Sequence, residues 1–97
     1  QPLTDKRAEL AAADARLSAI NGQITEIGKD QERVRENMKA LRGSAEEKAL
    51  TERYTRELNN QEDQLATLRA DQKKATDDRD GRRRELNDLA AKLAFEI

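Results

Sequence analysis

The sequence predicts an all-α protein, an antiparallel two-helix coiled coil folded as a hairpin. Charged residues make up 40% of the 97 residues and hydrophobic residues only 35%, with one Tyr, one Phe and no Trp. These are too few large apolar side chains for a compact core. The apolar residues nevertheless recur at heptad spacing, and periodic residues can be buried along a helix seam where scattered ones cannot. We therefore expect helix and not disorder.

The first helix is expected over about residues 3–42. The Asn21-Gly22 pair is a turn signal in other settings, but Ile24 and Ile27 keep the heptad phase, so the helix is expected to run through it. The seam follows two series in steps of seven, apolar at ten of twelve positions: Leu3, Leu10, Leu17, Ile24, Gln31 and Met38, and Lys6, Ala13, Ile20, Ile27, Val34 and Leu41.

A turn is expected at residues 43–44. Gly43 suits the left-handed backbone just past a helix end, and Arg42 places positive charge on the last turn. Ser44 and Glu47 have the spacing of a capping box, in which each side chain accepts a hydrogen bond from the backbone N–H of the other. The alternative, a kink within one long helix, is disfavoured because a stop signal and a start signal coincide.

The second helix is expected over about residues 45–95. Residues 72–84 contain no large apolar residue, so this stretch should be the least well packed. Two helices of about 40 residues joined by a tight turn must fold back on each other, and we expect residues 1–97 to form this one hairpin as a segment of a larger protein. Its seam is Leu58, Leu65, Gln72, Arg79, Leu86 and Leu93, with Tyr54, Gln61, Leu68, Ala75, Arg82 and Leu89.

Antiparallel pairing also predicts a register. If Leu41 lies level with Thr51, facing residues have numbers that add to 92, and the apolar positions of the two helices meet. Gln31 then meets Gln61, and two buried amides that satisfy each other would fix this register. Exposed flanking charges, each worth little, are expected to pair Arg35 with Glu62, Asp14 with Arg83 and Arg16 with Asp78.

Charge and residue types exclude several functions. The net charge is −1 and the chain has neither Cys nor His. It therefore lacks a large positive field that would attract nucleic acid, a thiol nucleophile, and the usual general base or metal ligand at neutral pH. Carboxylate pairs such as Asp77 and Asp78 are expected to be solvated. We predict a protein that is not an enzyme, with no catalytic, cofactor-binding or metal-binding residues and no apolar run long enough to span a membrane.

The seam also predicts self-association. In the expected register Leu10 faces Arg82 and Ile20 faces Gln72. Leu10, Leu17 and Ile20 are therefore expected to lack good partners inside the hairpin and to bind a second copy, as a homodimer, or a neighbouring domain of the parent chain. The sequence thus favours a structural and protein-interaction module that acts as a rigid helical spacer and as a dimerisation or docking element.

One basic cluster supports an alternative. Lys73 and Lys74 precede the run Arg82, Arg83 and Arg84, and Arg82 and Arg83 are expected to contact an acidic partner. The alternative function is a nucleic-acid-contacting arm that uses residues 73–84. Acidic neighbours neutralise this stretch and no aromatic residue is present there to stack on bases, so nucleic acid is the less favoured partner.

Four parts of the sequence together resemble the coiled-coil hairpin of a bacterial family. They are the segment Gln31–Met38, the Gly43-Ser44 turn, the segment Asn60–Asp63 and the ending Leu86–Phe95. Its members are mucoidy-inhibitor-like proteins bearing a domain of unknown function, in which β-rich domains carry helical hairpins. The resemblance covers residues 31–97. It implies a segment of a larger bacterial protein of the cell envelope or periplasm, with a scaffold or partner-binding role and no catalytic residues to carry over.

Overall fold

The computed structural model describes residues 1–96, and it confirms the all-α hairpin. Helix α1 comprises Pro2–Ala40 and helix α2 comprises Glu47–Glu96, with no strand in this range. The predicted helices extended to residue 42 and began again at residue 45. The connecting turn is therefore longer than predicted and covers residues 41–46.

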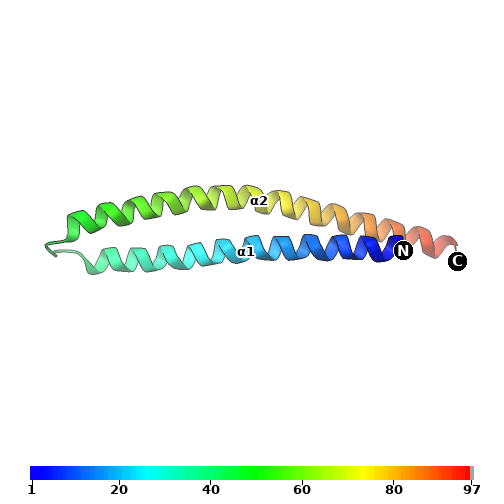
Figure 1. Ribbon diagram of the computed structural model, residues 1–97, viewed down its shortest axis with the longest axis horizontal. Helices are drawn as coiled ribbons and strands as arrows, with labels where there is room; N and C mark the ends of the chain where they lie inside the picture. The colour runs from blue at the N-terminus through cyan, green and yellow to red at the C-terminus, as the bar shows by residue number, and fades with distance from the viewer. Residues whose placement is uncertain (97) are drawn as a thin grey trace. The chain divides into compact units, whose positions relative to one another are not determined.

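The chain divides into two compact units. The first, Gly22–Arg69, contains the turn and is called the turn unit; the second, Gln1–Asn21 with Ala70–Ile97, is called the terminal unit. Within each unit a stretch of α1 lies beside a stretch of α2 (Figure 1). Because α2 follows the turn, the two stretches run antiparallel in both units.

Helix α1 begins at a proline, as helices often do. Pro2 has no backbone N–H, and its fixed φ suits the first helical position. The N–H of Asp5 donates to the Gln1 carbonyl at 3.0 Å, and the Thr4 hydroxyl donates to the Gln1 side chain at 2.8 Å. The Asp5 carboxylate lies in the first turn, where the helix dipole favours negative charge.

Helix α1 ends in a tightened turn followed by the predicted glycine. The N–H groups of Leu41 and Arg42 donate to carbonyls three residues earlier, at 3.2 and 3.3 Å, which is the tighter pattern common at helix ends. Gly43 has a φ of 80°, a left-handed conformation that costs glycine nothing and strains other residues. The left-handed residue was predicted correctly.

The predicted capping box does not form. The Glu47 carboxylate accepts from the N–H of Gly43 at 2.9 Å, while the N–H of Ser44 donates to the Leu41 carbonyl at 2.9 Å. The Ser44 hydroxyl oxygen is buried without a hydrogen-bond partner among the described residues. The prediction was wrong because α2 begins at Glu47, so Ser44 lies too far ahead of the helix to cap it.

The seam lies where the heptads predicted it. Every residue of the four heptad series is buried or half-buried, whereas most residues between them are exposed. Val34, with 0% exposure, is the most completely buried large side chain. Helix α1 runs through Asn21 and Gly22, and α2 is helical throughout residues 72–84. The buried hydrophobic residues are Ala13, Leu17, Ile20, Val34, Leu65 and Ala75.

Candidate functional site

A layer of amides and carboxylates crosses the seam of the turn unit. Gln31 and Gln61 are 6% and 8% exposed. The Gln31 side-chain amide donates to the Glu62 carboxylate at 2.8 Å, and the Gln61 amide donates to the Asp30 carboxylate. Each glutamine thus crosses to the acidic neighbour of the glutamine it faces. Both amides are buried as predicted, but the amide-to-amide bond was wrong, because a charged carboxylate is the stronger acceptor.

This layer is not fully satisfied. The side-chain oxygen of Gln61 is buried and accepts no hydrogen bond from the described residues. A buried acceptor left unpaired costs about 1–3 kcal/mol. We therefore assign the layer to pairing the correct positions of the two helices rather than to stability, as polar seam residues do in other coiled coils.

An arginine extends the layer toward the surface. Arg33 donates to Asp30 at 2.8 Å and reaches Glu57 on α2 at 3.2 Å. The hydrogen bond from Arg33, reinforced by its charge and by the Gln61 amide, holds the pKa of Asp30 below its ordinary value, although partial desolvation opposes it. The hydrogen bond to Asp30 likewise raises the pKa of Arg33. Asp30 therefore stays ionised as the acceptor for both donors.

The terminal unit has an ionic network at its own seam. Lys6 pairs with Glu85 at 2.8 Å, and Arg82 pairs with Glu9 at 3.0 Å and with Asp78 at 3.4 Å. The hydrogen bond with Glu85 is the largest cause of the raised pKa of Lys6, and the same bond lowers the pKa of Glu85. All of these side chains are partly exposed, so water screens each pair and each adds little to stability.

Cross-helix hydrogen bonds confirm the register within both units. In each of seven side-chain pairs, the two residues lie within two positions of the register in which facing numbers add to 92. The terminal unit holds Lys6 with Glu85, Glu9 with Arg82 and Asn21 with Gln72. The turn unit holds Asp30 with Gln61, Gln31 with Glu62, Arg33 with Glu57 and Asn37 with Tyr54.

The three predicted flanking ion pairs were wrong. None of them occurs among the ion pairs of residues 1–96, because the carboxylates take other donors or lie too far along the helix. Glu62 accepts from Gln31 and Asp78 pairs with Arg82. The expected pair of Asp14 with Arg83 lies five positions out of register, as does that of Arg35 with Glu62.

The predicted docking residues of α1 are largely covered within the terminal unit. Leu17 and Ile20 are each 8% exposed, and Leu10 is half-buried. The expectation that these side chains lack partners inside the hairpin was therefore wrong for Leu17 and Ile20. Ala75, which faces Leu17 in the register, is itself buried and small enough for close helix approach. The Arg79 side chain is only 26% exposed, and such long aliphatic stems can cover apolar surface.

The basic cluster is partly neutralised. Lys73 pairs with Asp77 at 3.0 Å, and Arg82 is held by its carboxylates in the terminal unit. The remaining cations of the cluster are exposed and make no ion pair with any described residue: Lys74, Arg83 and Arg84. Of the two arginines expected to contact an acidic partner, only Arg83 is free to do so in this conformation.

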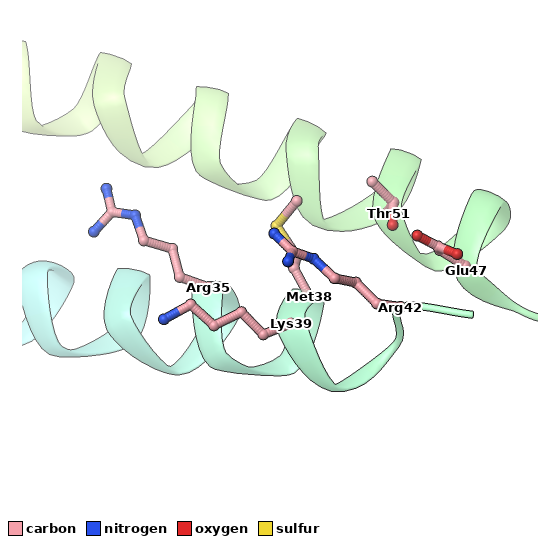
Figure 2. A pocket seen from close by; sticks show the side chains of 6 residues that line it. All are labelled: Arg35, Met38, Lys39, Arg42, Glu47 and Thr51. Atoms are coloured by element: carbon pink, nitrogen blue, oxygen red, sulfur yellow. The ribbon is translucent and has the colours of Figure 1, made fainter. Parts of the chain in front are cut away.

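A shallow hollow next to the turn was not predicted. It has a volume of about 310 Å³. Figure 2 shows Arg35 and Lys39 extending along α1 and the Arg42 side chain directed back toward Met38. The basic residues lie outside the heptad seam. Arg35 and Lys39, four residues apart, share one face of α1, and Arg42 follows in the turn. The hollow is lined by Arg35, Met38, Lys39, Arg42, Glu47 and Thr51.

The charges around this hollow are unequally satisfied. Lys39 pairs with Glu36 at 3.1 Å, and the Glu47 carboxylate accepts from the N–H of Gly43. Arg35 and Arg42 are exposed, and neither makes an ion pair with a residue that the structure describes. The hollow therefore presents two free guanidinium groups beside a half-buried thioether.

Residues 1–96 contain neither a cluster of metal-ligating side chains nor a membrane-spanning helix. Among residues 1–96, no three His, Cys, Asp or Glu side chains come together as a metal site would require. Neither helix has, within that range, the long apolar stretch needed to cross a membrane.

Comparison with known proteins adds no relative. No family model matches the chain, and neither a curated protein nor a solved structure matches it. The resemblance of residues 31–97 to mucoidy-inhibitor-like proteins therefore stays a prediction.

Proposed function

We propose that this chain is a non-catalytic helical interaction module that acts as a spacer and as a docking or dimerisation element. The observation that carries the proposal is the shared register: both units pair α1 with α2 through side chains close to the same facing positions. The hydrogen bonds of Gln31 and Gln61 in one unit and of Lys6 and Arg82 in the other support a single defined pairing. Such pairing is what a module needs in order to present fixed helix faces.

The electrostatics support a role in recognition rather than in acid–base chemistry. The resolved pKa shifts belong to Lys6, Asp30, Arg33 and Glu85, and each has an ion-pair hydrogen bond as its largest cause. Each shift reinforces the charge that the group carries at neutral pH. A general acid or base needs the opposite, a pKa brought toward neutrality by burial.

Self-association is tested by sedimentation equilibrium combined with circular dichroism. We expect the chain to form a dimer or a larger oligomer at about 100 µM. Association would bury apolar surface of both copies, and a high concentration favours the associated form by mass action. A fully helical monomer at that concentration would contradict the dimerisation part of the proposal. The docking part would then depend on partners other than a second copy.

The spacer role is tested by spin labelling, which is simple because the chain has no cysteine. Cysteines introduced at the exposed positions Ala8 and Ala49 would carry the labels, and dilution with unlabelled chain would suppress intermolecular distances. A spacer should give a narrow distribution of distances by pulsed electron resonance. A broad distribution would contradict the spacer role while leaving docking open.

The scaffold role implied by the family resemblance remains part of this proposal. If the chain belongs to a mucoidy-inhibitor-like protein of the cell envelope, its parent sequence should carry β-rich domains on both sides of the hairpin. The full-length coding sequence is the test. A parent without such domains would remove the family assignment but leave the interaction role intact.

A nucleic-acid-contacting arm is the second candidate, favoured only by the unpaired cations Lys74, Arg83 and Arg84. Fluorescence anisotropy with tRNA and with duplex DNA at about 50 mM salt tests it, because phosphate contacts are strongest at low salt. Binding that weakens steeply with added salt and is lost in Arg83→Gln/Arg84→Gln would support the arm. No binding at that salt would remove it.

A further inference from the structure

We propose that the hollow beside the turn binds an acidic polypeptide segment that carries an apolar side chain. The inference deepens the proposed docking role by assigning one site and one class of partner. The site consists of the guanidinium groups of Arg35 and Arg42, with Lys39 between them and Met38 as the apolar floor. The partner would place carboxylates on the arginines and its apolar side chain over the thioether.

The charge around the hollow is complementary to carboxylates. Arg35 and Lys39 lie on one face of α1 and Arg42 follows in the turn, while the one acidic lining residue, Glu47, already accepts a hydrogen bond from Gly43. Elsewhere in the turn unit an arginine in a comparable place is satisfied internally: Arg33 binds two carboxylates, one on each helix. Arg35 and Arg42 have no such partner among the described residues, and a planar guanidinium matches a carboxylate in two parallel hydrogen bonds.

The floor of the hollow distinguishes a peptide from other polyanions. Met38 is half-buried on the seam, and its flexible, polarisable thioether adapts to apolar side chains of different shapes. Thr51 on α2 borders the hollow, and none of its lining residues is aromatic. Stacking on nucleic-acid bases relies on such aromatic residues. An acidic segment with a leucine-like side chain uses both the cations and the floor.

The test measures binding of defined peptides to the full chain by fluorescence anisotropy. The probe is a fluorescein-labelled peptide of Glu-Glu-Leu repeats; companion peptides replace Leu with Gln or Glu with Lys. We expect the acidic and apolar peptide to bind most tightly, the Gln peptide more weakly and the Lys peptide not at all. Arg35→Gln/Arg42→Gln should weaken binding of the first peptide about tenfold, because two exposed ion pairs are lost.

The matched control is Arg56→Gln/Arg69→Gln. Both of these arginines are exposed on α2 in the same unit, and neither makes an ion pair with a described residue. The control therefore removes the same charge from residues that do not line the hollow, and it should change binding less than twofold. All four positions are exposed, so circular dichroism should show unchanged helix content in both variants.

Three outcomes would overturn the inference. Equal weakening by the two double variants would show that only net charge matters. Tighter binding of tRNA than of the acidic peptide, lost in Arg35→Gln/Arg42→Gln, would assign the hollow to nucleic acid. Loss of self-association in that variant without any peptide binding would assign it to a second copy, which would keep the docking role of the hairpin and reject only this partner.

Discussion

The turn unit and the terminal unit pair the same two helices in the same register but fill their seams differently. In the turn unit both helices contribute large apolar residues, with Val34 and Leu65 buried, and one polar layer interrupts them. In the terminal unit α1 contributes Leu17 and Ile20, whereas α2 contributes the small Ala75 and long arginines. Near its end α2 also adds the half-buried Leu86, Leu89 and Leu93. The first seam is therefore apolar on both sides, whereas the second has polar residues, Gln72, Arg79 and Arg82, on its α2 side.

The difference shows that a heptad position need not hold an apolar residue to be covered. Arg79 and Arg82 occupy seam positions and are only partly exposed. Their stems can lie along the seam while the guanidinium groups reach carboxylates at its edge, as Arg82 does with Glu9 and Asp78. Such a seam buries less apolar area than a leucine seam, so the terminal unit should be the less stable of the two.

Shortening a leucine in the turn unit should have the largest effect. Leu65 is 4% exposed, so Leu65→Ala should lower the free energy of unfolding by about 3 kcal/mol. Leu86, half-buried in the terminal unit, is the matched position, and Leu86→Ala should cost about 1 kcal/mol. Urea unfolding followed by circular dichroism at one protein concentration measures both. Equal losses would break the contrast between the units.

Replacing the polar layer should stabilise the turn unit. Gln61→Leu removes the unpaired buried oxygen and should raise the free energy of unfolding by about 1–2 kcal/mol. Gln31→Leu should raise it less, because no orphaned atom is removed with Gln31. The double variant should be the most stable and also the least specific in register. A fall in melting temperature for Gln61→Leu would mean that the layer stabilises the pairing.

Filling the polar side of the terminal seam should give a smaller gain. Arg79→Leu places an apolar side chain opposite the buried Ala13 and should raise the free energy of unfolding by about 1 kcal/mol. Arg83→Leu changes an exposed position and should leave stability nearly unchanged. Thermal unfolding of the two variants is the comparison. If Arg79→Leu lowered the free energy of unfolding instead, the aliphatic stem of Arg79 would cover the seam better than leucine does. The proposed difference in stability between the two units would then be wrong.

Acid should weaken the ion pairs of both units and lower stability by less than any of the seam substitutions above changes it. The pKa values of Asp30 and Glu85 lie below the ordinary 3.8 and 4.5, so the folded state favours the charged forms. Their contribution is complete above those values and is lost as pH falls through the lower folded-state pKa. Lys6, whose pKa is raised above 10.5, contributes below that value and loses its contribution only as pH rises through the raised one.

Thermal unfolding between neutral pH and about pH 2 measures this acid dependence. Asp30→Asn and Glu85→Gln should each lower the melting temperature at neutral pH and reduce its fall in acid. Asp63→Asn, which changes an exposed carboxylate that makes no ion pair with a described residue, is the control. If the melting temperature of both variants fell in acid as much as that of the unaltered chain, these pairs would not hold the helices together.

Heptad counting was enough to predict the helices, the seam and the register, because burial along a seam depends on spacing alone. It could not predict which atoms bond across the seam. The Gln31 amide donates to Glu62 rather than to Gln61, because a carboxylate one position away is the stronger acceptor. The capping box failed for a related reason: whether Ser44 can cap depends on where α2 begins, and that start lies at Glu47.

The candidate site was harder to predict than the fold. Leu17 and Ile20 are buried although neither faces a large apolar residue, since Ala75 lies opposite Leu17 and Gln72 opposite Ile20 in the register. The hollow beside the turn combines Arg35 from α1 and Arg42 from the turn with Thr51 from α2. Its floor appears only once the two helices are placed side by side, although the spacing of its basic residues could have drawn attention to that face.

Disulfide cross-linking tests the central claim, a common register in both units, most directly. The chain has no cysteine of its own, so pairs can be introduced at Ile27 with Leu65 in the turn unit and at Leu17 with Ala75 in the terminal unit. Two pairs shifted by one heptad, Ile27 with Leu58 and Leu17 with Leu68, serve as controls. We predict rapid intramolecular oxidation of both in-register pairs and little of either shifted pair. Efficient oxidation of a shifted pair, or failure of the Leu17 and Ala75 pair alone, would contradict a common register.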